Sequence, residues 1–218
     1  MRIPLVRGTS IENIDLVPSK IIGIGVNYRA HAIEMGRGLP EEPLMFLKPR
    51  SSMIAGGEAI ERPGGYKRVD YEAELGVVIA HRTRRVSREQ ALSAVLGFVC
   101  VNDVTVRDLQ QRDVQYTRAK GFDTFCPLGP RIVAGLDPSN LAIKTRVNGV
   151  IKQDSSTSDL IFDVPALIAF VSSHMTLEAG DVISTGTPSG VGNLSPGDEV
   201  EIEIEGIGVL KNSVIAAP

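Results

Sequence analysis

The chain has 218 residues, of which 43% are hydrophobic, and it carries a net charge of −3. This length allows a sizeable core in one domain or slightly more, and the chain lacks the basic excess of nucleic-acid-binding proteins. No apolar run approaches the length of a membrane span and no basic-then-apolar leader is evident, so we expect a cytoplasmic protein with neither a membrane nor a nucleic-acid partner.

The first part of the chain alternates short apolar segments with polar links. Residues 3–6 are a strand candidate followed by a polar link, so we expect an N-terminal extension over residues 1–18 and a main domain over residues 19–218. Residues 20–26 and 43–48 are typical of buried strands. Gly23 and Gly25 lack the third glycine of a dinucleotide-binding loop, so that function is only weakly indicated.

A short helix is predicted over residues 27–36, followed by a loop rich in glycine and proline. His31 and Glu34 are three residues apart, so they share one face of this helix. A carboxylate beside an imidazole fixes the tautomer of the ring and raises its basicity, which is how a general base is built. A short helix with such a loop is also typical of an active-site lid. The alternative interpretation is an ordinary surface pair.

Two glutamates lie close together in the strand predicted over residues 69–80. Side chains two apart on a strand share a face, so Glu72 and Glu74 point the same way. Two adjacent carboxylates repel each other, and a hard cation such as Mg²⁺ or Mn²⁺ between them removes the repulsion. A second apolar strand ends at Asp103, which offers a third carboxylate. The alternatives are a solvated edge strand and, for Asp103, a plain turn.

The middle and end of the chain carry clear local signals. Ser87, with Gln90 at the capping-box position, predicts a helix that continues to about residue 96. Asn148-Gly149 between β-branched residues predicts a hairpin. Asp163 predicts the N-cap of a further helix. Strict alternation over residues 199–205 predicts a half-exposed strand whose glutamates are solvated.

Lys120 lies in a loop of glycine and aromatic residues. Near three acids and a metal it would hold a substrate carboxylate or an enolate, whereas alone it would be a surface lysine. Residues 181–192 predict a strand followed by a Gly/Thr loop that offers donors to an anion without the pattern of a P-loop. Cys100 and Cys126 have no partner at metal-binding spacing, so we expect buried free thiols.

Taken together, these motifs resemble the fumarylacetoacetate hydrolase superfamily in its short form. The resemblance covers nearly everything from residue 21 to residue 214, in the order of the family. The matching segments are GIGVNYRAHAIEMG, MFLKP, DYEAELGVVI, GFVCVNDVTVRDLQ, RAKGFDTFCPLGP, VNGVIKQDSST and VISTGTPSGVG.

The resemblance implies a β-rich α+β fold, a mixed β-sandwich roll with short helices and an active-site lid, in a homodimer with Mg²⁺ or Mn²⁺. It also implies a role for nine side chains. These are the metal ligands Glu72, Glu74 and Asp103, the catalytic residues His31, Glu34 and Lys120, and the substrate-binding residues Arg107, Gln110 and Thr187.

The expected function is therefore metal-dependent cleavage of a C–C bond in a small 2-oxo acid, by hydrolysis of acylpyruvates or decarboxylation of oxaloacetate. Two alternatives stay open. One is an isomerase of 2-hydroxyhepta-2,4-diene-1,7-dioate, which uses the same metal and enol chemistry and only moves protons. The other is a metal- or ligand-binding paralogue without turnover, because a fold does not fix a function.

Overall fold

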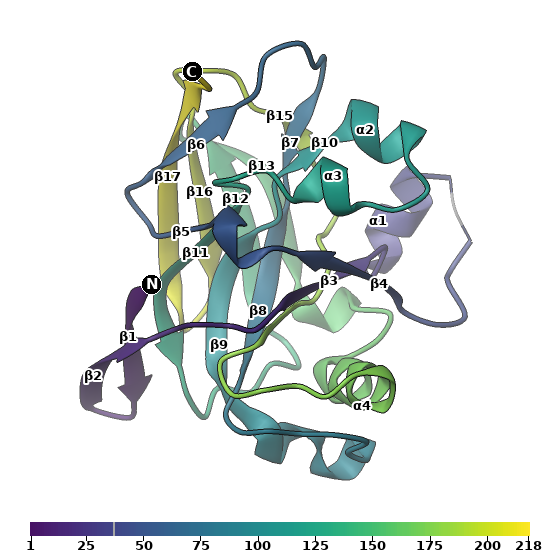
Figure 1. Cartoon of the computed structure of the whole chain (residues 1–218), viewed down its shortest axis with the longest axis vertical. Coiled ribbons are helices and arrows are strands. Elements are labelled where there is room, and N and C mark those ends of the chain that lie inside the picture. Colours follow the sequence, from purple (N-terminus) through teal and green to yellow (C-terminus); the bar gives the residue numbers. More distant parts are fainter. Residues whose placement is uncertain (37) are drawn as a thin grey trace.

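The fold is built on a nine-stranded mixed sheet, seen in a computed structural model that describes residues 1–36 and 38–218 (Figure 1). In sheet order the strands are β2 (Ser10–Asp15), β1 (Arg2–Arg7), β11 (Cys126–Val133), β9 (Val95–Asn102), β8 (Ala73–Ile79), β14 (Val182–Ser184), β3 (Ile21–Gly25) and β4 (Leu44–Lys48), with β5 (Met53–Ile54) paired to β11. The pairs β1–β11, β5–β11 and β3–β14 are parallel.

Two smaller sheets complete the architecture. The five-stranded sheet runs β13 (Val150–Ser156), β12 (Ala142–Val147), β16 (Glu199–Ile204), β17 (Gly208–Ala216) and β6 (Ala59–Arg62). The three-stranded sheet runs β10 (Thr105–Val106), β7 (Val69–Tyr71) and β15 (Gly192–Asn193). The glutamates of β16 lie on its partly exposed side, as the alternation predicted.

The main sheet is apolar on both faces. On one face Leu75 and Val77 belong to the same buried cluster as Ile202 of the five-stranded sheet. On the other face Val99 packs in a second cluster with Leu5 of β1. Because strands alternate their side chains, this two-sided burial explains the near-continuous apolar runs of β8 and β9. The core therefore holds rigid the strand ends from which the polar site residues project.

The helices are short and lie at the edges of the sheets. They are α1 (Arg29–Glu34), α2 (Arg107–Arg112), α3 (Thr117–Lys120), α4 (Val164–His174) and the 3₁₀ helices η1 (Arg50–Ser52), η2 (Arg88–Ala94) and η3 (Thr157–Asp159). Helices α1, α2 and α3 gather on one side of the molecule, near β4 and β10 (Figure 1). Among the described residues, no helix combines the length and apolar character that a bilayer crossing needs.

Several local predictions are confirmed. Asn148 and Gly149 both adopt positive φ, at 52° and 77°, as a tight hairpin turn between β12 and β13 requires. The Asp163 carboxylate accepts a hydrogen bond from the Ala166 amide and caps α4. Both cysteines are buried and free. The β-rich α+β fold is as expected.

Two local predictions need correction. The helix predicted from Ser87 is present as a 3₁₀ helix that ends at Ala94 rather than at about residue 96, and the Ser87 side chain makes no capping hydrogen bond. The Gln90 amide bonds instead to the Ser87 carbonyl, and only the small Ala91 and Ala94 are buried, so little apolar packing favours a regular α-helix. The polar link before residue 18 contains strand β2, because backbone pairing to β1 needs no apolar side chains at a sheet edge.

Candidate active site

Three carboxylates meet where β7 and β9 end and β8 begins. Glu72 lies in the one-residue break between β7 and β8, Glu74 is the second residue of β8, and Asp103 directly follows β9. Pairing of Ala73 with Asn102 and a hydrogen bond from the Asp103 amide to the Glu72 carbonyl (2.9 Å) bring the strands into register. One oxygen from each carboxylate lies within 4.8 Å of the others, and all three residues are buried.

Two buried lysines each donate a hydrogen bond to a different oxygen of the Asp103 carboxylate. Lys120 Nζ donates to Asp103 Oδ2 (2.5 Å), to Glu72 Oε2 (2.8 Å) and to the Thr105 hydroxyl (2.9 Å). Lys48 Nζ donates to Asp103 Oδ1 (2.6 Å). Lys120 was among the predicted site residues, whereas sequence reasoning gave no role to Lys48. Its only signal is a lysine that ends an apolar strand just before a proline.

Arg107 connects the carboxylates to the start of α2. Its Nη2 donates to Glu72 Oε1 (2.6 Å), its Nε to Asp70 Oδ2 (2.8 Å) and its Nη1 to Gln110 Oε1 (2.7 Å). Asp70 is fully buried, and its other oxygen accepts a hydrogen bond from Arg68 Nε (2.8 Å). Arg107 and Gln110 therefore lie where they were expected, and Asp70 is a partner that the sequence did not reveal.

The charges leave Glu74 uncompensated. Burial acts to raise the pKa of Glu72, but the positive charges of Lys120 and Arg107 outweigh it and lower that pKa to about 2. Burial, followed by the negative charges of Asp103 and Glu72, raises the pKa of Glu74 well above its ordinary value. The Glu74 partners are the Ser184 hydroxyl (2.5 Å) and the Gly186 amide (2.8 Å), which are neutral.

This site fits a divalent cation. Of its four buried acids, Asp70, Glu72 and Asp103 each pair with basic side chains, whereas among the described residues no basic side chain pairs with Glu74. Carboxylate oxygens are the donors that Mg²⁺ and Mn²⁺ prefer. A cation beside Glu74 would remove the repulsion that raises the pKa of this carboxyl.

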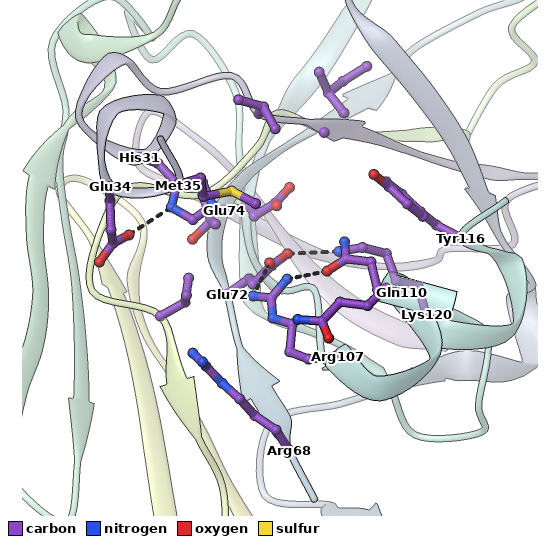
Figure 2. A pocket seen from close by; sticks show the side chains of 16 residues that line it. His31, Glu34, Met35, Arg68, Glu72, Glu74, Arg107, Gln110, Tyr116 and Lys120 are labelled. Atoms are coloured by element: carbon purple, nitrogen blue, oxygen red, sulfur yellow. Dashed lines mark hydrogen bonds and ion pairs between the residues drawn. The ribbon is translucent and has the colours of Figure 1, made fainter. Parts of the chain in front are cut away.

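The His31–Glu34 pair lies on α1, across the cavity from Lys120. His31 Nδ1 is 2.9 Å from Glu34 Oε2, and His31 is buried (Figure 2). The Gly190 amide donates to both Glu34 oxygens (3.2 and 3.4 Å), which ties the helix to the loop after β14. Because Nδ1 faces the carboxylate, Nε2 is the ring nitrogen left for a substrate or a water molecule.

Thr187 is positioned by a glutamine that sequence reasoning missed. Gln153 Nε2 donates to the Thr187 hydroxyl (2.9 Å) and to the Pro188 carbonyl (2.8 Å). Its Oε1 accepts from the Ala73 amide (3.1 Å), which lies between the two glutamates. Gln153 thus joins the Gly/Thr loop to the carboxylate site.

Eight of the nine predicted site residues line one cavity of about 540 Å³. Asp103 lies behind this surface and reaches the site through Lys120. Figure 2 shows the lid pair on one side of the cavity, with Lys120 and Tyr116 on the other. Tyr116 and Arg68 are lining residues that the sequence analysis did not single out.

Comparison with known proteins identifies the family. The family model for the fumarylacetoacetate hydrolase C-terminal domain matches residues 20–215. The chain belongs to this family. It is 46% identical to the oxaloacetate tautomerase YisK of Bacillus subtilis, over 90% of this chain and 70% of that protein.

Solved structures agree with this assignment. The 5-carboxymethyl-2-hydroxymuconate delta-isomerase of Mycobacterium smegmatis matches with a TM-score of 0.88 and 47% identity, covering 93% of this chain and 81% of that one. Fumarylpyruvate hydrolase of Pseudomonas aeruginosa, in complex with Mn²⁺ and pyruvate, matches with a TM-score of 0.89 and 30% identity, covering 99% and 96%. The family and its fold are thus as the sequence motifs predicted, and these named relatives are enzymes.

Proposed function

We propose that this protein is an enzyme, dependent on Mg²⁺ or Mn²⁺, that cleaves a C–C bond in small 2-oxo acids. The observation that carries the proposal is that the His31–Glu34 pair and the glutamates Glu72 and Glu74 open onto the same cavity. A protein that only bound a metal would have no need for an imidazole facing that metal site with one nitrogen fixed and the other free.

Glu72, Glu74 and Asp103 would hold the cation. When bound, the cation would supply Lewis-acid polarisation of the 2-oxo group. Three carboxylates leave coordination positions open, which suits a catalytic site better than a closed structural one.

The chain's own residues would handle the proton and the charge. His31 Nε2 would take a proton from a water molecule that attacks the carbonyl carbon at the far side of the scissile bond, while Glu34 keeps the ring oriented. As the C–C bond breaks, its electron pair would pass to the 2-oxo acid fragment as an enolate, and His31 would return its proton to the carbon that held the broken bond. Lys120 would stabilise the negative charge of the enolate, and Arg107, Gln110 and Thr187 would bind the substrate.

A second candidate reaction is tautomerisation or isomerisation of a 2-oxo acid. It is favoured by the 46% identity to a protein named an oxaloacetate tautomerase and the 47% identity to one named an isomerase. This reaction moves a proton between carbon and oxygen and needs no attacking water, so His31 would act only as a proton carrier. We also propose a homodimer, which light scattering of the purified protein would test.

An ultraviolet assay with Mg²⁺ or Mn²⁺, with and without EDTA, distinguishes these reactions. Metal-dependent loss of acetylpyruvate or decarboxylation of oxaloacetate would support C–C cleavage. Interconversion of oxaloacetate tautomers, or turnover of the heptadienedioate, without cleavage would support the second candidate. Metal binding without turnover of any of the three would contradict both.

Variants then test the residue roles. We expect Glu72→Gln and Asp103→Asn to lose metal binding and activity together. His31→Ala should keep its metal affinity, measured by calorimetry, and lose hydrolysis by about 100-fold or more, the usual contribution of a general base. His81→Ala, which changes an exposed histidine outside the cavity, is the matched control. Full metal affinity in Asp103→Asn would contradict the ligand assignment.

A further inference from the structure

Arg68 is a cation at the mouth of the cavity that the proposed mechanism does not use. Its side chain is 52% exposed and lines the cavity. Figure 2 shows the guanidinium reaching towards the space between Arg107 and the lid pair.

The backbone of Arg68 is firmly held. Its amide donates to Asp108 Oδ2 (3.0 Å), and its carbonyl accepts from the Arg107 amide (2.9 Å). Its Nε donates to Asp70 Oδ1 (2.8 Å). The guanidinium therefore projects from a fixed base at the start of β7, and it needs little ordering before it binds a ligand.

Arg68 differs from the other cations of the cavity in its open donors. All three nitrogens of Arg107 donate to side chains of the site, and Lys120 Nζ has three acceptors. In residues 1–36 and 38–218, by contrast, the two terminal nitrogens of Arg68 have no hydrogen-bond acceptor. A guanidinium edge with free donors matches the two oxygens of a carboxylate.

A line of alternating charges joins Arg68 to the carboxylate site. It runs from Arg68 to Asp70, from Asp70 to Arg107, and from Arg107 to Glu72, with separations of 2.8, 2.8 and 2.6 Å. Asp70 thus holds both guanidinium groups, one facing the reacting end of the cavity and the other facing its mouth. A substrate bound at the carboxylates would extend towards Arg68.

We infer that Arg68 determines specificity by binding a second carboxylate, at the far end of the substrate. The protein would then prefer 2-oxo dicarboxylic acids over 2-oxo monocarboxylic acids of the same length. This inference rests on the proposed function, which places the 2-oxo group of the substrate at the carboxylate site. It adds that the opposite end of the substrate carries a carboxylate.

The test compares two ligands that differ only in that carboxylate. Calorimetry on the metal-loaded protein would measure the affinity for 2-oxoglutarate and for 2-oxopentanoate, which carries a methyl group instead. We expect the wild type to bind the diacid at least about tenfold more tightly, as a charge-assisted hydrogen bond provides. Arg68→Gln should lose most of this preference, and Arg68→Lys should retain part of it.

Lys67→Gln is the matched control, because it removes a positive charge from the neighbouring exposed residue, which does not line the cavity. It should keep the preference, whereas an equal loss in Lys67→Gln would show a general field effect and overturn the assignment. A wild type without a preference, or an unchanged preference in Arg68→Gln with an unchanged melting temperature, would also overturn it.

Fumarylpyruvate and acetylpyruvate kinetics separate this inference from the proposed function, because fumarylpyruvate carries a carboxylate beyond the scissile bond and acetylpyruvate does not. In Arg68→Gln, kcat/KM for fumarylpyruvate should fall about tenfold more than kcat/KM for acetylpyruvate, mainly through KM. Diacid binding that depends on Arg68, in a protein that turns over no 2-oxo acid, would support the inference and contradict the proposed function. Turnover of 2-oxo acids by Arg68→Gln with the substrate selectivity of the wild type would support the proposed function and contradict the inference.

Discussion

Gln153 shows how one buried side chain can fix several parts of a site. An amide group can donate two hydrogen bonds and accept two, and Gln153 makes all four. Besides its bonds to Ala73, Thr187 and Pro188, it accepts one from the Thr145 hydroxyl (2.6 Å). The backbone between the two glutamates and the Gly/Thr loop therefore have a common support.

Replacing this amide should damage both stability and the site. We expect Gln153→Met to lower the free energy of unfolding by about 2–4 kcal/mol, because buried backbone groups at Ala73 and Pro188 lose their partners. Gln153→Glu keeps the acceptor for the Ala73 amide but turns an acceptor towards the Pro188 carbonyl and adds a buried acid beside the two glutamates, so it should raise KM through Thr187 and lower stability at least as much. Urea denaturation and steady-state kinetics would measure these effects, with the exposed Gln90→Met as control. Wild-type stability and KM in both variants would contradict this role.

Among the individual residues of the site, the sequence predicted the three carboxylates but not the side chains that support the site around them. Glu72 and Glu74 could be found because a strand places alternate residues on one face, and Asp103 because it ends an apolar segment. Lys48 and Gln153 could not, since Asp103 lies 55 residues from Lys48 and Thr187 lies 34 residues from Gln153 in the chain. Nothing local distinguishes a lysine that will be buried against an aspartate from one on the surface.

Among the elements, α4 is the one whose stability depends most directly on a single local signal. Asp163 accepts from the Ala166 amide (3.0 Å) at the start of the helix, and its other oxygen pairs with Arg88 at the surface. A capping side chain satisfies an amide that has no partner within the helix. Exposed ion pairs contribute little, so the cap should account for most of the effect of this residue.

Asp163→Ala should therefore lower the free energy of unfolding by about 1 kcal/mol, whereas Asp163→Asn should lower it by much less, because asparagine keeps the capping oxygen and loses only the charge. Thermal denaturation of both variants would test this. Equal losses in the two variants would mean that the ion pair with Arg88, rather than the cap, is what matters.

Elements with strong local chemistry were predictable, and those defined by their neighbours were not. The hairpin at Asn148-Gly149 and the helix from Asp163 follow from turn and cap residues within a few positions. Strand β2 forms because β1 offers it a backbone edge, and η2 is a 3₁₀ helix although its Ser/Gln spacing matches a capping box. In both cases the conformation is decided by tertiary contacts, and it cannot be predicted from the local propensities of the residues.

For the whole molecule, the buried charges link stability to pH in opposite directions. The pKa of Glu72 is lowered to about 2, so this residue stabilises the fold above its unfolded-state pKa, and the contribution is lost as the pH falls towards 2. The pKa of Glu74 is raised, so the folded state binds this proton more tightly than the unfolded state. Its favourable contribution is present at low pH and is lost as the pH rises through the raised pKa.

Glu74→Gln should consequently make the metal-free protein more stable at pH 7. The glutamine oxygen can still accept from Ser184 and Gly186, while a neutral amide replaces an uncompensated charge beside Asp103, so we expect a gain of about 1 kcal/mol or more. The same change removes a proposed metal ligand. Saturating Mn²⁺, at 100 times its dissociation constant, should stabilise the wild type by about 2.7 kcal/mol and the variant by much less.

Denaturation in EDTA and in Mn²⁺, with the exposed Glu42→Gln as control, measures both effects. A metal-free Glu74→Gln protein less stable than the wild type would mean that Glu74 is already compensated without a metal. An unchanged response to Mn²⁺ would remove Glu74 from the ligand set. The two expected results together would mean that Glu74 lowers the stability of the metal-free protein because it keeps a negatively charged cation site in the core. Metal binding would then restore the lost stability.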